Sequence, residues 1–312
     1  MTLRILITGA EGQLGRALIR TAPAGVTVLP LDVDQLDITD AAAVRRCCDD
    51  HAPSVIVNAA AYTAVDRAED EADLAYAVNR DGARHLADAA ARIDARLVQV
   101  STDFVFGGDQ ARPYTRGDSP NALGVYGASK LAGEEAVRSS SVRKWLILRT
   151  AWVYAADGHN FAKTMLRLMR DGKPVRVVAD QIGTPTWATS LARGVWRAID
   201  LGITGVHHWT DAGVASWYDF AVAIQEEALA CGQLATPVPV TPITTKDFPT
   251  PARRPLYSVL DKTETWQALD MTAAHWRENL RHMLAELPAS SETIDTTAEA
   301  IDDPPRQRLA KA

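Results

Sequence analysis

The chain has few cysteines, no long apolar run and no excess of positive charge, and each absence excludes a class of protein. Its 312 residues include three cysteines, Cys47, Cys48 and Cys231. Adjacent cysteines rarely bridge each other and an odd count fits no disulfide framework, so we expect a reducing, cytoplasmic setting. No stretch approaches the roughly 18 apolar residues of a membrane span. The formal net charge of -6 offers no basic field to nucleic acid or anionic lipid. Neither a membrane nor a nucleic acid is therefore expected as a partner.

The first half of the chain alternates short β-branched runs with stretches of helical periodicity. The runs predict strands at 4–8, 26–31, 54–58, 96–101 and 145–149. The stretches between them predict helices at 14–21, 41–50, 72–91 and 127–138. Such alternation is typical of a parallel sheet with right-handed crossovers, covered by helices on both faces. The predicted fold class is therefore α/β, with a Rossmann-type doubly wound parallel sheet.

After about residue 150 the alternation becomes less regular. Helices are predicted at 161–170, 190–200, 217–230 and 272–287. Segment 236–255 contains six prolines and is predicted to be an ordered loop. Residues 289–312 are polar and acidic, and are predicted to form a disordered tail.

A glycine motif directly follows the first predicted strand. Gly9, Gly12 and Gly15 are three residues apart and precede a predicted helix. Glycines let the backbone turn sharply and approach a pyrophosphate, and the helix N-terminus supplies amide donors and a favourable dipole. Asp32 lies 20 residues after Gly12, where a carboxylate would accept from the adenosine ribose and repel a 2′-phosphate. The motif predicts a dinucleotide site that favours NADH, or dual use, over strict NADPH. A glycine turn without a ligand and a solvated loop aspartate are the alternatives.

The position of this motif suggests that the first part of the chain binds the cofactor and the second part binds the substrate. Residues 1–155 are expected to form mainly an NAD(P)-binding Rossmann domain. Residues 156–288 are expected to form mainly a smaller C-terminal substrate-binding α/β region, which can interleave with the first.

Tyr126 and Lys130 are four residues apart at the start of a predicted helix, so their side chains share one face. A free tyrosine has a pKa near 10, and a nearby lysine cation is expected to lower it. Thr102 ends the fourth strand, where open α/β sheets bind ligands, and is the candidate hydrogen-bond partner of the reacting oxygen. The Tyr–Lys spacing alone is common on surface helices. Together with the glycine motif and Thr102, it predicts a nicotinamide-dependent oxidoreductase whose proton donor is Tyr126.

Longer motifs carry a resemblance to a known family. They include Asn58-Ala-Ala-Ala-Tyr-Thr-Ala-Val-Asp66, Ser101-Thr-Asp-Phe-Val-Phe106, Tyr126-Gly-Ala-Ser-Lys-Leu-Ala-Gly-Glu134 and Thr250-Pro-Ala-Arg-Arg-Pro255. From about residue 3 to 285, the chain resembles the extended short-chain dehydrogenases and, among them, the dTDP-4-dehydrorhamnose reductases. The resemblance implies NADPH- or NADH-dependent reduction of the 4-keto group of dTDP-4-dehydro-L-rhamnose. The product would be dTDP-L-rhamnose, used in cell-surface polysaccharide synthesis.

The resemblance also implies residue roles. Tyr126 would protonate the 4-oxygen, Lys130 would hold the nicotinamide ribose, and Thr102 would lie beside the reacting carbon. Substrate contacts are implied for Thr102, Asp103, Tyr126, Trp152 and Arg253. Cofactor contacts are implied for Gly9, Gly12, Gln13, Leu14, Asp32, Asp37, Ile38, Ala61, Tyr62, Thr63, Val100 and Lys130.

Two of the implied substrate contacts have a physical basis of their own. The ring face of Trp152 could stack on a sugar or a base, the alternative being a core tryptophan. Arg253, with Arg254 beside it, could meet a diphosphate, the alternative being a solvated basic loop. No metal is predicted. Some family members share magnesium across a dimer through carboxylates near the first helix, where this chain has Arg16-Ala17-Leu18. The resemblance allows a homodimer.

Two other functions remain open at this point. A related branch keeps the fold as a non-catalytic regulatory subunit, but such a scaffold has no need of Thr102, Tyr126 and Lys130. Epimerases and dehydratases of the superfamily are the second alternative. Dehydratases of this kind need a second acid directly after Asp103, where this chain has Phe104. The missing acid favours a simple ketone reduction.

Overall fold

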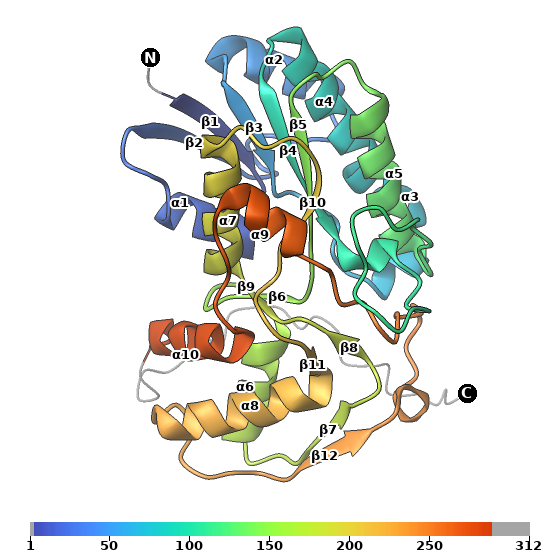
Figure 1. The fold of residues 1–312 in the computed structure, drawn as a ribbon, viewed down its shortest axis with the longest axis vertical. Coiled ribbons are helices and arrows are strands. Elements are labelled where there is room, and N and C mark those ends of the chain that lie inside the picture. Colours follow the sequence, from blue (N-terminus) through green and yellow to red (C-terminus); the bar gives the residue numbers. More distant parts are fainter. Residues whose placement is uncertain (1–2, 289–312) are drawn as a thin grey trace, which may run out of the picture.

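The computed structural model of the chain describes residues 3–288, and the predicted tail at 289–312 lies outside the described residues. Figure 1 shows two lobes, one above the other along the longest axis of the molecule. The upper lobe contains a large sheet with helices beside it, and the lower lobe contains helices and short strands. No helix in the described part of the chain is both long enough and apolar enough to cross a membrane.

A six-stranded sheet forms the centre of the upper lobe, with the strand order β2-β1-β3-β4-β5-β10 (Figure 1). The strands are β1 Leu3–Thr8, β2 Val26–Leu31, β3 Val55–Asn58, β4 Arg96–Thr102, β5 Trp145–Thr150 and β10 Gly205–His208. Every neighbouring pair is parallel. After β2 the chain crosses β1 to form β3, so the direction of winding reverses between β1 and β3. Open α/β sheets bind ligands at this point, beyond the carboxyl ends of the strands.

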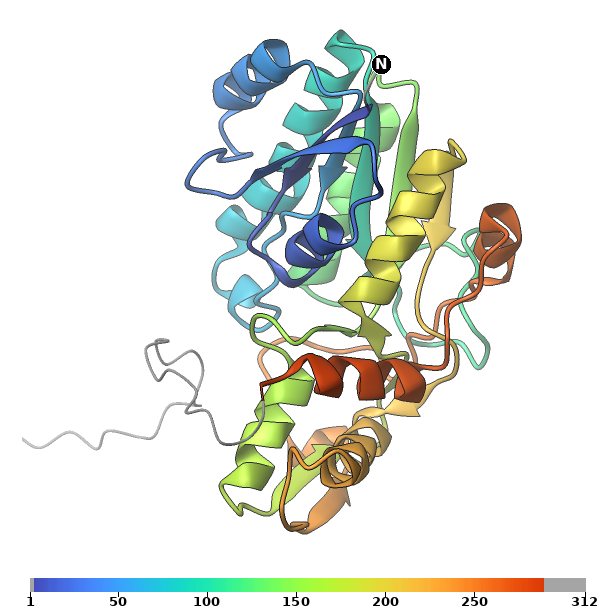
Figure 2. The same ribbon diagram turned by 90° about the vertical axis from the view of Figure 1, so that its left-hand side faces the viewer.

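Helices cover both faces of the sheet. In Figure 2, α2 and α4 (blue and teal) lie on one side of the strands and α7 (yellow) lies on the other. The helices of the upper lobe are α1 Gln13–Arg20, α2 Ala41–His51, α3 Ala72–Tyr76, α4 Ala83–Arg92, α5 Val125–Ser139, α7 Ala188–Asp200 and α9 Thr263–Leu269. Ile5 of β1 packs with α1 and α7, whereas Leu6 packs with α2, α4 and α5. Successive residues of a strand point to opposite faces, so this buried, hydrophobic strand serves two cores. The predicted doubly wound α/β fold is confirmed.

The lower lobe has its own core. Its elements are β6 Val153–Tyr154, α6 Phe161–Arg170, β7 Val175–Val178, β8 Ile182–Gly183, β9 Thr186–Trp187, β11 Ala215–Ser216, α8 Trp217–Ala230, β12 Val240–Ile243 and α10 Trp276–Glu286. Leu166 of α6, Phe220 of α8 and Leu280 of α10 are buried together. The helices predicted at 161–170 and 217–230 are present with these bounds. Helix α8 begins with a capping box, in which Ser216 and Asp219 bind each other's backbone amides.

Several elements were not predicted from the sequence, among them α9 and the short strands β6, β7, β8, β9 and β11. Three further differences concern the large sheet, the helix before β4 and the proline-rich segment. Strand β10 was not predicted, although it pairs with β5 along its whole length. The single helix expected at 72–91 is divided by a π-helical segment, Ala77–Gly82. The expectation that 236–255 is a loop throughout is wrong, because β12 lies within it and pairs in parallel with β7. Pro242 is tolerated there because the sheet has only two strands, and a proline can direct its missing N–H away from its partner.

Candidate active site

The glycine motif forms a tight turn between β1 and α1. Gly9 has a φ of +66°, and a Cβ at this residue would lie 2.6 Å from the backbone N of Ala60. A Cβ at Gly15 would lie 2.2 Å from the carbonyl oxygen of Gly9. Helix α1 starts directly after Gly12 and has no side-chain cap, so its first amides are available to an anion. The turn therefore has the close backbone approach and the open donors that a pyrophosphate requires.

A cavity of about 770 Å³ lies at the carboxyl ends of β1, β3, β4 and β5. This volume is within the range of small-molecule and cofactor sites. The residues with an implied cofactor contact all line it: Gly9, Gly12, Gln13, Leu14, Asp32, Asp37, Ile38, Ala61, Tyr62, Thr63, Val100 and Lys130. Thr102, Tyr126 and Trp152 line it as well. The structure thus brings together residues that are up to 143 positions apart in the sequence, from Gly9 to Trp152.

Other lining residues were not anticipated from the sequence. They are Glu11, Val33, Leu36, Ala59, Ala60, Leu74, Val78, Ser101, Thr150, Ala151, Val153, Gly158, His159 and Leu191. Most are small or apolar, so their side chains carried little signal, although Ala59, Ala60 and Ser101 lie within the motifs that carry the resemblance. Gly158 and His159 come from the connection into α6, which shows that the lower lobe closes one side of the cavity.

The segment after β2 forms one end of the cavity. Asp32 is half-buried, and its backbone N–H donates to Gln35 Oε1 at 2.8 Å. The carbonyl of Ile38 is 3.0 Å from Nδ1 of His85 on α4, which holds this segment against the upper lobe. Lys130 is the only lysine or arginine among the described residues that line the cavity. The described lining of the cavity therefore provides no lysine or arginine beside Asp32 to pair with a 2′-phosphate.

Thr102, Tyr126 and Lys130 meet at the other end of the cavity. Tyr126 is hydrogen-bonded to Thr102. Thr102 Oγ1 donates to Asp103 Oδ1 at 3.1 Å and accepts from the Phe104 N–H at 3.2 Å. Lys130 is one helical turn after Tyr126, and its Nζ donates to the carbonyl of Val100 at 2.7 Å. The three side chains predicted to carry the chemistry are therefore in one place.

The pKa values of this group differ from expectation. Burial raises the pKa of Tyr126 to about 12, while its hydrogen bond with Thr102 acts in the opposite direction. Burial lowers the pKa of Lys130 to about 8, and the charge of Glu134 opposes this shift. The expectation that Lys130 lowers the pKa of Tyr126 is therefore wrong, since desolvation dominates. A phenol with this pKa keeps its proton at neutral pH, as a proton donor must.

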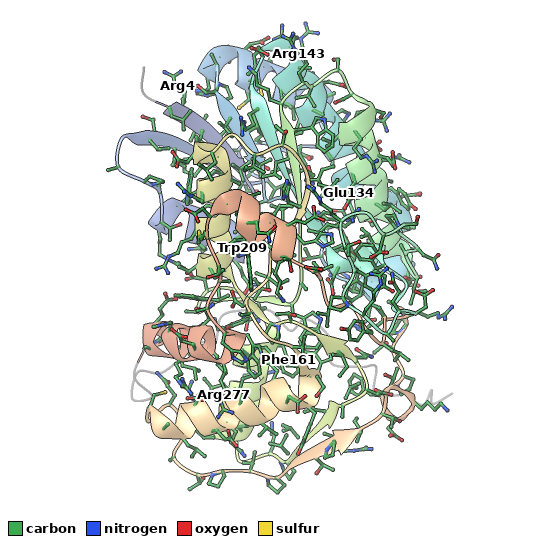
Figure 3. All side chains as sticks on the ribbon, viewed as in Figure 1. Arg4, Glu134, Arg143, Phe161, Trp209 and Arg277 are labelled. Carbon is green, nitrogen blue, oxygen red and sulfur yellow. The ribbon has the colours of Figure 1, made fainter. Side chains whose placement is uncertain are left out.

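A buried ion pair lies behind the cavity. Nε and Nη2 of Arg149 donate to the two carboxylate oxygens of Glu134, at 2.9 and 2.7 Å. The two side chains are 2% and 0% exposed, respectively. Ser101, which lines the cavity, donates its hydroxyl to Glu134 Oε1 at 2.5 Å. Figure 3 marks Glu134 beside the sheet in the upper lobe. The pair joins α5 to β4 and β5, and so fixes the helix that carries Tyr126 and Lys130.

Two predicted substrate residues lie outside the lining of the cavity. Asp103 is 1% exposed, and its burial raises its pKa to about 6, against hydrogen bonds with Ser258 and Thr102. Arg253 is exposed, while its neighbour Arg254 forms an ion pair with Asp66, with Nη1 and Nη2 at 3.0 and 2.8 Å from the carboxylate oxygens. Their contact with a substrate stays a prediction.

Trp152 is half-buried and lines the cavity, so it is not a core tryptophan. Its ring is stacked on that of Trp217, with 3.5 Å between the ring centroids and 6° between the planes. The ring face covered by Trp217 is therefore not free for a sugar.

Within residues 3–288, no group of three or more histidine, cysteine or acidic side chains is placed to hold a metal ion. The three cysteines are free.

Comparisons with known proteins assign the chain to a family. A family model described as "RmlD substrate binding domain" matches residues 3–289. The curated dTDP-4-dehydrorhamnose reductase of Aggregatibacter actinomycetemcomitans is 43% identical over 290 residues, which are 90% of this chain and 98% of that protein.

Solved structures agree with this assignment. The structure of a dTDP-4-dehydrorhamnose reductase from Clostridium acetobutylicum has a TM-score of 0.86 at 43% identity, with 90% of this chain and 98% of that one covered. The structure of the Bacillus anthracis dTDP-4-dehydrorhamnose reductase, a complex with NADP, has a TM-score of 0.87 at 38% identity, with 92% and 100% covered. The chain therefore belongs to the RmlD family, the family of the dTDP-4-dehydrorhamnose reductases.

Proposed function

We propose that this protein uses NADPH or NADH to reduce the 4-keto group of dTDP-4-dehydro-L-rhamnose, giving dTDP-L-rhamnose for cell-surface polysaccharide synthesis. One observation carries the proposal. Thr102, Tyr126 and Lys130 meet at one cavity with the glycine turn, in a chain that spans nearly the whole length of reductases with this activity in their names.

The cavity fits a nicotinamide dinucleotide. The glycine turn leaves no room for a Cβ at Gly9 or Gly15, and the first amides of α1 are available for the pyrophosphate. Asp32 would accept hydrogen bonds from the adenosine ribose and Lys130 would bind the nicotinamide ribose, which is supported by their place in the lining of the cavity. When bound, the reduced cofactor supplies the hydride to C4 of the sugar. The relative that binds NADP and the carboxylate of Asp32 together support the use of both cofactors.

The residues of the chain provide the proton and the orientation. Tyr126 keeps its proton until the sugar O4 develops negative charge, and then donates it. Thr102 holds O4 by a hydrogen bond at the end of β4. The Lys130 cation, held by the carbonyl of Val100, binds the nicotinamide ribose.

The proposal includes a division of the chain and a location. Residues 1–155 mainly bind the cofactor, and residues 156–288 mainly bind the dTDP-linked sugar. Asp103, Trp152 and Arg253 join Thr102 and Tyr126 in contacting that sugar. The free cysteines support a reducing, cytoplasmic compartment.

The test is oxidation of NADPH, and separately of NADH, by the purified protein with dTDP-4-dehydro-L-rhamnose, with the product identified by NMR. We expect one nicotinamide to be oxidised for each dTDP-L-rhamnose formed. A folded protein that binds the cofactor without turnover would indicate the regulatory alternative. Purified protein that carries tightly bound NAD, and consumes none that is added, would indicate an epimerase.

A further inference from the structure

The ring of Trp152 is covered on one face by Trp217. The two indoles are almost parallel and overlap closely, with 3.5 Å between centroids. Trp217 also contacts Phe161, at 4.7 Å between ring centroids. Figure 3 marks Phe161 in the lower lobe, and Trp217 is the first residue of α8. The lower lobe thus supplies the support for a side chain that follows β5 of the upper lobe.

Gly183 covers the other face. A Cβ built on Gly183 would lie 2.5 Å from Cε2 of Trp152, 2.7 Å from Nε1 and 2.8 Å from Cζ2. Cε2 is bonded to both Nε1 and Cζ2. A Cβ in the plane of the ring, outside its edge, would be nearer to Nε1 or Cζ2 than to Cε2. Because this Cβ is nearest to Cε2, it lies above the plane of the ring. Trp217 fills the space above the first face, which leaves the opposite face for Gly183. Gly183 therefore restricts this face over Cε2, Nε1 and Cζ2 of the indole.

The two covering residues belong to one unit. Gly183 ends β8, which pairs in antiparallel fashion with β11, and Gly183 is opposite Ala215. Strand β11 leads directly into Trp217, where the capping box fixes the start of α8. The backbone of Trp152 has a φ of +47°, a strained conformation for a non-glycine residue. Its carbonyl accepts a hydrogen bond from Thr186 N–H at 3.1 Å. Together these contacts hold the indole ring of Trp152 in one position.

Neither Trp217 nor Gly183 lines the cavity, whereas Trp152 does. We propose that Trp217 and Gly183 are positioning residues that clamp the indole of Trp152, so that the lower lobe sets the shape of the site for the sugar of the nucleotide-sugar substrate. This inference rests on the proposed function. It assigns a role to the pairing of β8 with β11, which lies outside the cofactor-binding sheet. A small error in the position of a substrate-contacting group can cost as much as about a hundredfold in rate.

Variants on the two sides of the ring test the clamp. Trp217→Ala removes the stacked face, and we expect the KM for the nucleotide sugar to rise about tenfold while the Kd for NADPH stays within about twofold. Trp217→Phe keeps an aromatic face and is expected to restore most of the affinity. Gly183→Ala removes no contact, and Gly183 has no positive φ that an alanine would strain. Its new methyl group displaces the indole, so the KM for the sugar is again expected to rise.

The control is Tyr218→Ala. Tyr218 is the next residue of α8, is similarly half-buried and packs on the same core, but takes no part in the stack. We expect its KM for the sugar to stay within about twofold of the wild type. Binding of dTDP-L-rhamnose to each variant in the presence of NADP, measured by calorimetry, gives a readout that does not depend on turnover.

Two results would overturn the clamp. The first is wild-type affinity for the sugar in both Trp217→Ala and Gly183→Ala, with folding verified by thermal melting. The second is an equal loss of affinity in Tyr218→Ala, which would mean that α8 supports the lobe in general. If the wild-type protein binds dTDP-L-rhamnose but shows no turnover, only the proposed function is contradicted, because the binding affinities of the variants still test the clamp. If the wild-type protein neither binds dTDP-L-rhamnose nor shows turnover, both the proposed function and the clamp are contradicted.

Discussion

We expect the loss of activity at alkaline pH, the alkaline limit, to follow the deprotonation of Lys130 and not that of Tyr126. Burial lowers the pKa of Lys130 to about 8 and raises that of Tyr126 to about 12. The Lys130 ammonium is therefore present below pH 8 and is lost as the pH rises through 8, well before the phenol ionises. At one pH unit above this pKa about one tenth of the enzyme keeps the cation, so kcat/KM for NADPH should fall about tenfold per unit.

The assay is the initial rate of NADPH oxidation across the range from about pH 7 to 10, because kcat/KM for the cofactor reports ionisations of the free enzyme. Glu134, one turn after Lys130, raises the pKa of Lys130 by its negative charge, although Arg149 offsets part of that charge. Glu134→Gln should therefore move the alkaline limit to lower pH. The position of the limit does not depend on how much of the variant is folded.

Glu135→Gln is the matched control, because it removes an equal charge from an exposed position on the same helix and should leave the limit in place. An alkaline limit near about pH 10, the ordinary lysine range, would show that burial does not govern Lys130. A limit that Glu134→Gln leaves unchanged would show that the ion pair has no electrostatic effect on it. Either result would refute the reasoning.

Three further predictions concern single groups. Tyr126→Phe should lower kcat by about 10² to 10⁴ and spare the NADPH Kd in calorimetry, because only acid catalysis is lost; an equal loss of cofactor affinity would indicate a structural tyrosine. Gly9→Ala should lower the free energy of unfolding by about 1–3 kcal/mol and weaken NADPH binding, because φ is positive and the Cβ meets Ala60. In urea unfolding, Arg149→Met should lower the free energy of unfolding by about 3–5 kcal/mol, because it leaves Glu134 unpaired. Adding Glu134→Leu should recover most of this loss. Equal stability of the single and double variants would contradict this account.

The parts of the fold that depend on local chemistry could be predicted from the sequence. β-branched runs such as Val26–Leu31 are strands, and the spacing of Gly9, Gly12 and Gly15 identified the turn between β1 and α1. Thr102 could be placed at the cavity because the carboxyl ends of parallel strands lie at one edge of a sheet, and Tyr126 and Lys130 could be paired because residues four apart share a helix face.

The remainder depends on contacts between distant segments. Strand β10 is only four residues long and joins the sheet through pairing with β5, which no local pattern encodes. The ion pair of Glu134 and Arg149 and the stack of Trp152 on Trp217 likewise depend on the packing of separate elements. The pKa of Tyr126 was predicted in the wrong direction because a sequence shows the neighbouring lysine and not the loss of water around both groups.

Strand β10 also affects how the protein is made. The sheet that presents the cavity is completed by residues 205–208, and α7 at 188–200 covers the face that α1 shares. During synthesis the edge of β5 therefore has no partner until about two-thirds of the chain has left the ribosome. An unpaired strand edge can pair with the wrong strand, so during this interval the edge of β5 is a site at which the nascent chain can aggregate. The order of segments in the chain thus delays the completion of the large sheet until β6, α6, β7, β8 and β9 of the lower lobe have been translated.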